Sequence, residues 1–196
     1  MIKRIFDILG SLAGLLFMAP ITPFIGLAIV LESGLPIFVK LDRISSGRVI
    51  QVYKFRSMIQ KAHELKPRLQ NFNERRDGPF FKIAQDPRVT KVGRLLRKTR
   101  IDEFPQFWNV LKGDLALVGP RPHEPEEVAA YPEAFHSLGF AKAGLTGLSQ
   151  VKGASALPFL KELEHDLYYI KNQSISLDCK ILFETARIFF SDPTGV

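Results

Sequence analysis

The sequence predicts a mostly helical α/β monotopic membrane protein, attached to a single face of the bilayer. Three observations favour this fold class: an uncharged run at residues 8–31, basic amphipathic segments after it, and short strand-like and helical patterns through the rest of the chain. The 196 residues are enough for one folded core but not for a second full domain. We therefore expect a single domain over residues 1–196, made of a membrane hairpin, interfacial helices and a small cytoplasmic globular part.

Charge and cysteine content narrow the possible classes. The net charge of +7 suits negatively charged partners, such as an anionic membrane, a phosphorylated substrate or nucleic acid. The chain has one cysteine, which excludes an intramolecular disulfide and a zinc site built from several thiolates. We expect this residue, Cys179, to be a small buried apolar side chain.

The uncharged run is long enough to cross a bilayer, which takes about 20 residues. Two features favour a helix–break–helix hairpin instead. Pro20 and Pro23 fall in the middle of the run, where each removes a backbone donor, and basic residues flank the run on both sides. We predict a re-entrant membrane hairpin over residues 5–31, with a single spanning helix as the alternative. Ser11 or Thr22 could supply hydrogen bonds to the broken backbone.

Two extended segments follow the hairpin. Residues 37–39 have the composition of a strand, 45–47 form a predicted turn, and 49–55 alternate weakly between apolar and polar side chains. Lys54 and Arg56 lie on either side of an aromatic residue at the end of the second segment. Two cations in this position suit a phosphorylated substrate or a lipid head group. The alternative is the solvated basic edge of a strand.

A basic amphipathic helix is predicted after a polar stretch. The polar stretch suggests a helix from about residue 60 to Asn73 and then a loop at 77–79. Apolar residues then recur at helical spacing up to Lys98, while basic residues, including Arg88 and Arg97, occupy much of the remaining surface. Such a helix is typical of contact with an anionic membrane or with nucleic acid. The preceding membrane segment favours the membrane.

Two adjacent carboxylates, Asp102 and Glu103, lie at the centre of the chain. Pro105 follows them and opens a helical pattern that Gly113 ends, so Asp102 is predicted to be the helix N-cap. An ionised aspartate in this cationic setting could also attack phosphorus as a nucleophile, and the second carboxylate could hold Mg²⁺. The simpler interpretation is a capping residue beside a first-turn acid.

Two later elements carry candidate polar side chains. The stiff loop Pro120–Arg121–Pro122 presents a guanidinium group that suits a bidentate grip on phosphate. On the predicted helix 157–171, Asp166 falls within the apolar stripe, where a carboxylate is costly unless it is paired, bound to metal or solvated by a cleft. The alternative for Asp166 is a buried salt bridge. A last amphipathic helix is predicted to end near residue 190.

The stretch from Arg97 to Pro122 resembles the signature of the bacterial sugar transferases, which are monotopic phosphoglycosyl transferases. Further similarity at residues 54–58, at 143–153 and around Asp166 extends the resemblance over most of the chain. Two positions depart from the family pattern. Ala19 stands where the family has a serine at the helix break, and Ala154 stands where many relatives have an arginine, for which Lys152 could substitute.

The resemblance implies transfer of a sugar-1-phosphate from a UDP-sugar to polyprenol (undecaprenyl) phosphate, which gives polyprenyl-diphosphate-sugar and UMP. This is a first membrane step of exopolysaccharide, capsule, lipopolysaccharide O-antigen or glycoprotein biosynthesis. Asp102 would form a covalent aspartyl-phosphosugar intermediate, and Glu103 would help to place Mg²⁺, with Asp166 and Asp102 as further metal candidates. The substrate-binding residues would be Lys54, Arg56, Arg88, Arg97, Pro120, Arg121, Pro122 and Lys152.

The resemblance also implies a location at the cytoplasmic face of the bacterial inner membrane, in contact with anionic phospholipid. It suggests a minimal catalytic unit without a large N-terminal extension, leaves a homodimer open, and predicts no nucleic-acid partner. The alternative from another class is a non-enzymatic membrane-anchored scaffold that binds anionic lipid through its basic amphipathic helices. A scaffold should tolerate Asp102→Asn.

Overall fold

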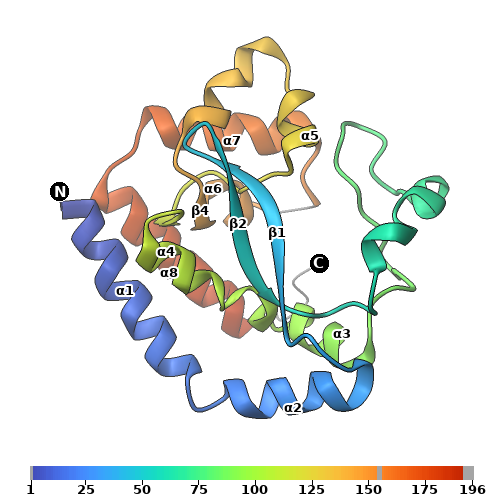
Figure 1. The fold of residues 1–196 in the computed structure, drawn as a ribbon. Helices are drawn as coiled ribbons and strands as arrows, with labels where there is room; N and C mark the ends of the chain where they lie inside the picture. The colour runs from blue at the N-terminus through green and yellow to red at the C-terminus, as the bar shows by residue number, and fades with distance from the viewer. Residues whose placement is uncertain (1, 154–155, 192–196) are drawn as a thin grey trace.

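The computed structural model describes residues 2–153 and 156–191, in which helices surround two small sheets (Figure 1). The helices are α1 (Ile2–Met18), α2 (Thr22–Ser33), α3 (Lys91–Lys98), α4 (Gln106–Lys112), α5 (Pro125–Ala129), α6 (Leu148–Val151), α7 (Phe159–Lys171) and α8 (Ile175–Ser191). The strands are β1 (Phe38–Ser45), β2 (Arg48–Phe55), β3 (Ala116–Val118) and β4 (Gly144–Thr146). Short 3₁₀ segments are η1 (Ala62–Leu65), η2 (Pro67–Phe72), η3 (Ile101–Glu103) and η4 (Glu133–Phe140). The predicted α/β class with mostly helical content is confirmed.

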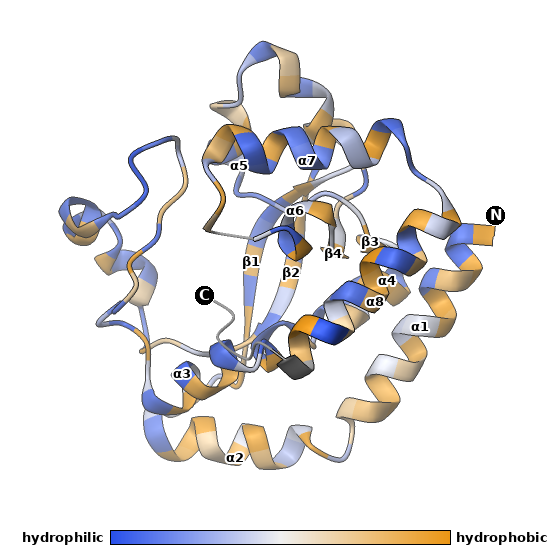
Figure 2. Cartoon of the chain, turned by 180° about the vertical axis from the view of Figure 1, so that it is seen from behind, coloured by the Kyte–Doolittle hydropathy of each residue, from blue (hydrophilic) through white to orange (hydrophobic). Residues whose placement is uncertain are grey.

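The N-terminal helices α1 and α2 are bent by 60° at a short break, as the two prolines predict. Thr22 Oγ1 donates to the carbonyl of Met18 across the break at 2.9 Å, while Ser11 Oγ donates to Ile8 O within α1. Within the described residues, no single helix is long and apolar enough to cross a membrane. The bent pair together has the length and composition needed to do so. The outer faces of both helices are apolar (Figure 2).

The start of α1 is fixed to the globular part by buried polar contacts. Lys3 Nζ lies 2.6 Å from Asp178 Oδ2 on α8, and Asp7 accepts a hydrogen bond from Leu117 N at 2.9 Å. Arg4 donates to the carbonyls of Val110 and Leu111 at the end of α4. Because each of these groups is satisfied by a partner far away in sequence, the direction of α1 is set by the core.

The two sheets are of different kinds. β1 and β2 form an antiparallel hairpin that pairs from Phe38–Phe55 to Ser45–Arg48. Its predicted turn is confirmed, and Ser46 and Gly47 there adopt left-handed φ values of 53° and 72°. β3 and β4 pair in parallel. The main core packs both sheets against α4, α7 and α8, and consists of Ile50, Val52, Val110, Leu115, Leu117, Val118, Ala143, Tyr169 and Ile181.

Three local predictions are wrong. Residues 60–73 form two 3₁₀ segments rather than one α-helix. Asp102 is not an N-cap, since it lies inside the 3₁₀ turn η3, and α4 begins only at Gln106 after Pro105. Cys179 is exposed on α8 rather than buried. The predicted helix end is confirmed, because Gly113 has a φ of 90°.

Candidate active site

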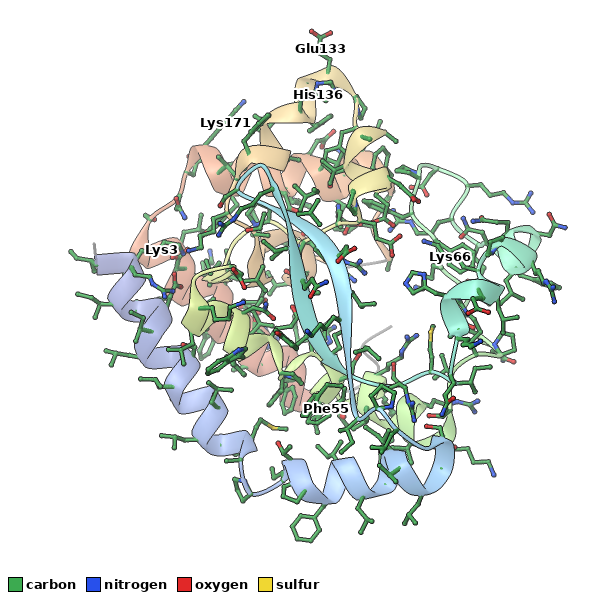
Figure 3. All side chains as sticks on the ribbon, viewed as in Figure 1. Lys3, Phe55, Lys66, Glu133, His136 and Lys171 are labelled. Atoms are coloured by element: carbon green, nitrogen blue, oxygen red, sulfur yellow. The ribbon has the colours of Figure 1, made fainter. Side chains whose placement is uncertain are left out.

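A cavity of about 1480 Å³ lies between the β1–β2 hairpin, the η1–η2 segment, α3 and the loop that follows β3. Two of its lining residues are labelled in Figure 3: Phe55, at the end of β2, and Lys66, between η1 and η2. Most of the predicted site residues line this one cavity, namely Lys54, Arg56, Arg88, Arg97, Asp102, Glu103, Arg121 and Pro122.

Positive charge dominates the cavity wall. The basic residues are Lys40, Lys54, Arg56, Lys61, Lys66, Arg75, Lys82, Arg88, Arg94, Arg97, Lys98, Arg100 and Arg121. The acidic residues are fewer, namely Asp86, Asp102, Glu103, Glu124, Glu127 and Glu162. A concave wall with this balance attracts a ligand that carries several negative charges, such as a diphosphate.

The two adjacent carboxyl groups at the cavity differ in acidity. Burial raises the pKa of Asp102 to about 6, against the opposing charges of Lys54 and Arg97. Burial also acts to raise the pKa of Glu103, but Lys54 and Arg121 outweigh it and lower that pKa to about 2. Lys54 Nζ lies 2.6 Å from Glu103 Oε1. Glu103 is therefore ionised at neutral pH, while Asp102, only 6% exposed, loses its proton within reach of neutrality.

The structure explains how α3 presents Arg97. Arg97 Nε donates to Ser57 Oγ at 2.9 Å, which holds the side chain against the chain leaving β2. Arg100 then turns the chain with a left-handed φ of 54° into the η3 turn that carries Asp102 and Glu103. The guanidinium and the two carboxyl groups are thus delivered to one wall by a short and rigid segment.

Two of the predicted substrate-binding arginines make buried contacts with the protein. Arg56 is 4% exposed and donates through Nη2 to Ser33 Oγ and to Gly34 O, at the end of α2. Arg88 is 6% exposed and is paired with Asp86 at 2.6 Å. Both side chains line the cavity while they also fix its wall.

Three predicted residues are not part of the lining of this cavity. Asp166 is 2% exposed, and its Oδ2 accepts a hydrogen bond from Arg121 N at 3.1 Å. Asp166 and Pro120 line a separate pocket of about 10 Å³, which has room for about one water molecule. Lys152 is exposed and borders neither space, and Ala154 lies outside the described residues.

Burial raises the pKa of Asp166 to about 6. Ser149 is close enough to act against that rise, although neither Ser149 Oγ nor Asp166 Oδ1 has a hydrogen-bond partner of good geometry in the described part of the chain. The buried salt bridge that was the alternative for Asp166 is instead formed by its neighbour on α7, Glu162, with Arg75 at 3.1 Å.

A cluster of three buried polar side chains in the cavity wall was not predicted from the sequence. Its members are Arg75, His123 and Glu162. Arg75 also donates to Leu157 O, and His123 lies 3.5 Å from Glu162 with its other ring nitrogen against Tyr131 Oη. His123 is 5% exposed. The partners are far apart in sequence and follow no short motif, so only the fold brings them together.

The carboxylates suit one mode of Mg²⁺ binding. Across the described residues, no group of three or more His, Cys, Asp or Glu side chains is placed to hold a metal ion. Mg²⁺ often takes only one or two carboxylates and completes its shell with water and substrate phosphate. The pair Asp102–Glu103 brings two carboxyl groups to the cavity wall, and Asp166 does not line this cavity.

A comparison with known protein families decides the relationship. The model of the bacterial sugar transferase family matches residues 1–192. This chain belongs to the bacterial sugar transferase family. The match includes the α1–α2 helix pair, the basic helix α3 and the carboxylate pair Asp102–Glu103. The sugar transferase resemblance predicted from the sequence is therefore confirmed.

Individual sugar transferases are similar over most of this chain. It is 38% identical over 190 residues to the undecaprenyl-phosphate galactose phosphotransferase of Salmonella typhimurium, which covers 95% of this chain and 40% of that protein. It is 38% identical over 193 residues to the UDP-N-acetylgalactosamine-undecaprenyl-phosphate N-acetylgalactosaminephosphotransferase of Aeromonas hydrophila. That match covers 95% of this chain and 43% of that protein. It is 36% identical over 196 residues to the exopolysaccharide production protein PSS of Rhizobium leguminosarum. That match covers 94% of this chain and 92% of that protein. The chain thus spans about two fifths of the length of the first two relatives.

Proposed function

We propose that this protein transfers a sugar-1-phosphate from a UDP-sugar to polyprenol phosphate, and so begins the assembly of a lipid-linked glycan. The single observation that carries the proposal is the pair of adjacent carboxyls with opposite pKa shifts in a basic cavity. The family supports the reaction, since relatives are named for transfer to undecaprenyl phosphate. We also propose that residues 1–196 act as one catalytic domain.

The carboxylate of Asp102 attacks the phosphorus that carries the sugar. An Asp–O–P bond forms, the phosphoanhydride bond breaks, and UMP leaves with the bridging oxygen. The phosphate oxygen of the polyprenol phosphate then attacks the same phosphorus and releases Asp102 as the carboxylate. One phosphoanhydride is consumed and one is formed, so the exchange needs no further source of energy.

The basic residues at the cavity wall stabilise charge in this exchange. Lys54 keeps Glu103 ionised, while Arg97 and Arg121 offer planar guanidinium groups to the diphosphate. Asp102 and Glu103 are the side chains that would hold Mg²⁺ together with substrate oxygens. When bound, the ion neutralises charge on the diphosphate and on the departing UMP.

The bent helix pair is proposed to be a re-entrant membrane hairpin on the cytoplasmic face of the bacterial inner membrane. Two observations support this topology over a spanning helix. Lys3 at the start of α1 binds Asp178 of the globular part, and Arg56 of the globular part binds Ser33 and Gly34 at the end of α2. Both ends of the hairpin therefore belong on one side. The exposed apolar side chains of the pair include Leu9, Leu16 and Phe24, which suit the bilayer interior.

The cavity is well placed for a lipid substrate. Leu35, Pro36 and Phe38, which follow α2 directly, belong to its lining together with Asp102. A phosphate at the membrane surface could therefore reach the carboxylate while its polyprenyl tail stays in the bilayer. The basic wall and α3 are also suited to contact with anionic phospholipid.

The test is release of UMP by the purified protein in detergent, with Mg²⁺, undecaprenyl phosphate and a panel of UDP-sugars. We expect release for one sugar, only when the lipid phosphate is present, and its loss in Asp102→Asn. Glu164→Gln is the matched control, since Glu164 pairs with Lys161 on the exposed face of α7.

Release that survives Asp102→Asn would remove Asp102 as the nucleophile. No release across a complete panel of nucleotide sugars, combined with tolerance of Asp102→Asn in cells, would contradict the enzyme and favour the membrane scaffold.

A further inference from the structure

The end of the membrane hairpin is hydrogen-bonded to α3 through the side chain of Glu32. Glu32 Oε1 accepts a hydrogen bond from Lys91 N at 2.7 Å, and Oε2 accepts one from Val92 N at 2.8 Å. These are the first two N–H groups of α3, which have no partner within the helix. Although desolvation acts to raise it, the pKa of Glu32 is lowered by these backbone bonds, so the carboxylate is ionised at neutral pH.

The first turn of α3 has its N–H groups occupied from outside the helix. Thr90 Oγ1 accepts from Gly93 N at 2.9 Å, which adds the third N–H to the two that Glu32 binds. The cap is thus shared between the residue before the helix and a residue that lies 59 positions away on the membrane hairpin. A helix cap taken from a separate element fixes the position of one element relative to the other.

The helix α3 is also pressed against the chain that leaves β2. A Cβ atom added to Gly93 would lie 1.9 Å from the carbonyl oxygen of Ser57, so the helix backbone and the strand exit are in close contact. Arg97 binds Ser57 Oγ from the next turn. Glu32 and Ser57 therefore both hold the first turns of α3 in place.

The catalytic turn rests on an apolar cluster built partly from the hairpin. The cluster contains Met18 of α1, Ile29 of α2, Phe55 of β2 and Leu96 of α3. Ile101 and Phe104, which flank Asp102 and Glu103 in the chain, pack against it. A shift of α2 relative to α3 would therefore also shift the support of the carboxylate pair.

We propose that Glu32 is a positioning residue, which locks the membrane hairpin to α3 and so holds Arg97 and the Asp102–Glu103 turn in their working arrangement. The proposal rests on the proposed function, and it makes the hairpin part of the catalytic framework in addition to an anchor. Glu32 itself lies outside the cavity lining.

The test compares kcat and KM of Glu32→Ala, Glu32→Gln and Glu32→Asp with wild type, using the UDP-sugar found active in the panel. Glu164→Ala is the control, because it also removes an exposed helix glutamate. We expect Glu32→Ala to lower kcat by about ten- to a hundred-fold, the scale of a small misplacement of reacting groups, with a smaller change in KM. Glu32→Asp should restore part of kcat, because it keeps a carboxylate.

Hydrogen exchange on the same proteins separates positioning from the reaction itself. In Glu32→Ala the amides of Lys91 and Val92 and those of residues 97–103 should exchange faster, while those of α8 keep their protection. If α8 loses protection too, the variant has unfolded, and Glu32→Gln, which keeps one acceptor oxygen, decides in its place.

Each remaining outcome has one meaning. Unchanged kcat, or faster exchange confined to Lys91 and Val92, would overturn the positioning role. If wild type released no UMP across the complete panel and cells tolerated Asp102→Asn, the proposed function would fail, and exchange at residues 97–103 would still decide whether Glu32 positions the turn.

Discussion

The carboxyl group of Asp102 is buried, although the proposed reaction needs it ionised. Its pKa of about 6 in the folded protein lies above the value near 3.9 of an unfolded aspartate. As the pH rises from about 4 to about 6, the unfolded state loses this proton before the folded state does, so stability falls over that range and stays lower above pH 6. Below about pH 4 both states are protonated and the difference disappears.

We predict that Asp102→Asn unfolds at a higher temperature than wild type at pH 8, and that this gain shrinks towards pH 4. The neutral amide removes the cost of the buried charge. Thermal unfolding of both proteins in detergent, followed by the fluorescence of the single tryptophan, Trp108, measures it. An equal gain at both pH values would contradict the assigned ionisation.

Lys54 controls the ionisation of the pair. Its charge lowers the pKa of both Asp102 and Glu103. In Lys54→Met we expect the acidic limb of the pH–rate profile, which lies near pH 6 in wild type, to move to higher pH because Asp102 keeps its proton longer. The initial rate of UMP release between pH 5 and pH 9 tests this. A lower rate with an unmoved limb would mean that Lys54 acts only by binding substrate.

At the scale of elements, the approach of α3 to the β2 exit depends on a missing side chain. Gly93→Ala should destabilise the protein by about 1–3 kcal/mol or more, since backbone must move to admit the methyl group. It should also reduce UMP release, because Arg97 loses its contact with Ser57. Thermal unfolding and initial rates measure both effects.

The control is Gly139→Ala, whose new Cβ would meet only a side-chain methyl of Val128, at 3.1 Å. It should be tolerated far better than Gly93→Ala. Equal effects of the two changes would show that the close approach at α3 is not special.

Much of the element order could be predicted, because local chemistry decides it. The prolines mark the break between α1 and α2, the turn residues mark the β1–β2 hairpin, and Gly113 ends α4. The N-cap assignment of Asp102 failed because Arg100 adopts a left-handed conformation, and the 3₁₀ turn that follows places Pro105 just before α4. No propensity in the sequence signals this turn.

Some residues of the candidate site could be predicted from the sequence and others could not. Lys54, Arg97 and the carboxylate pair belong to motifs and could be named from the sequence. His123, Glu162 and Glu32 could not, because their partners are set by the tertiary fold. Asp166 was correctly placed on the apolar stripe of its helix. Periodicity predicts only which face of a helix a residue occupies, so it could not show that Asp166 lies outside the lining of the cavity that Asp102 lines.

At the scale of the whole molecule, a re-entrant hairpin requires that both its ends and α8 face the same compartment. Cys179 is the single cysteine and is exposed on α8, so it reports the side of the globular part. In a Cys179→Ser background, Ile2→Cys reports the start of α1. We expect a membrane-impermeant maleimide to label both proteins in inverted vesicles and neither in spheroplasts. Labelling of Ile2→Cys in spheroplasts would establish a spanning helix.

The contact between Lys3 and Asp178 has a consequence for biosynthesis. These partners are 175 positions apart, so at about 5–20 residues per second the ribosome makes Asp178 roughly 9 to 35 seconds after Lys3. Until Leu117 is made, the nascent hairpin lacks the amide that later binds Asp7, and until Asp178 is made it lacks this contact with α8. Its apolar outer faces can meet the bilayer at once. Insertion would then precede docking, and the emerging globular part would close onto a hairpin already held at the membrane.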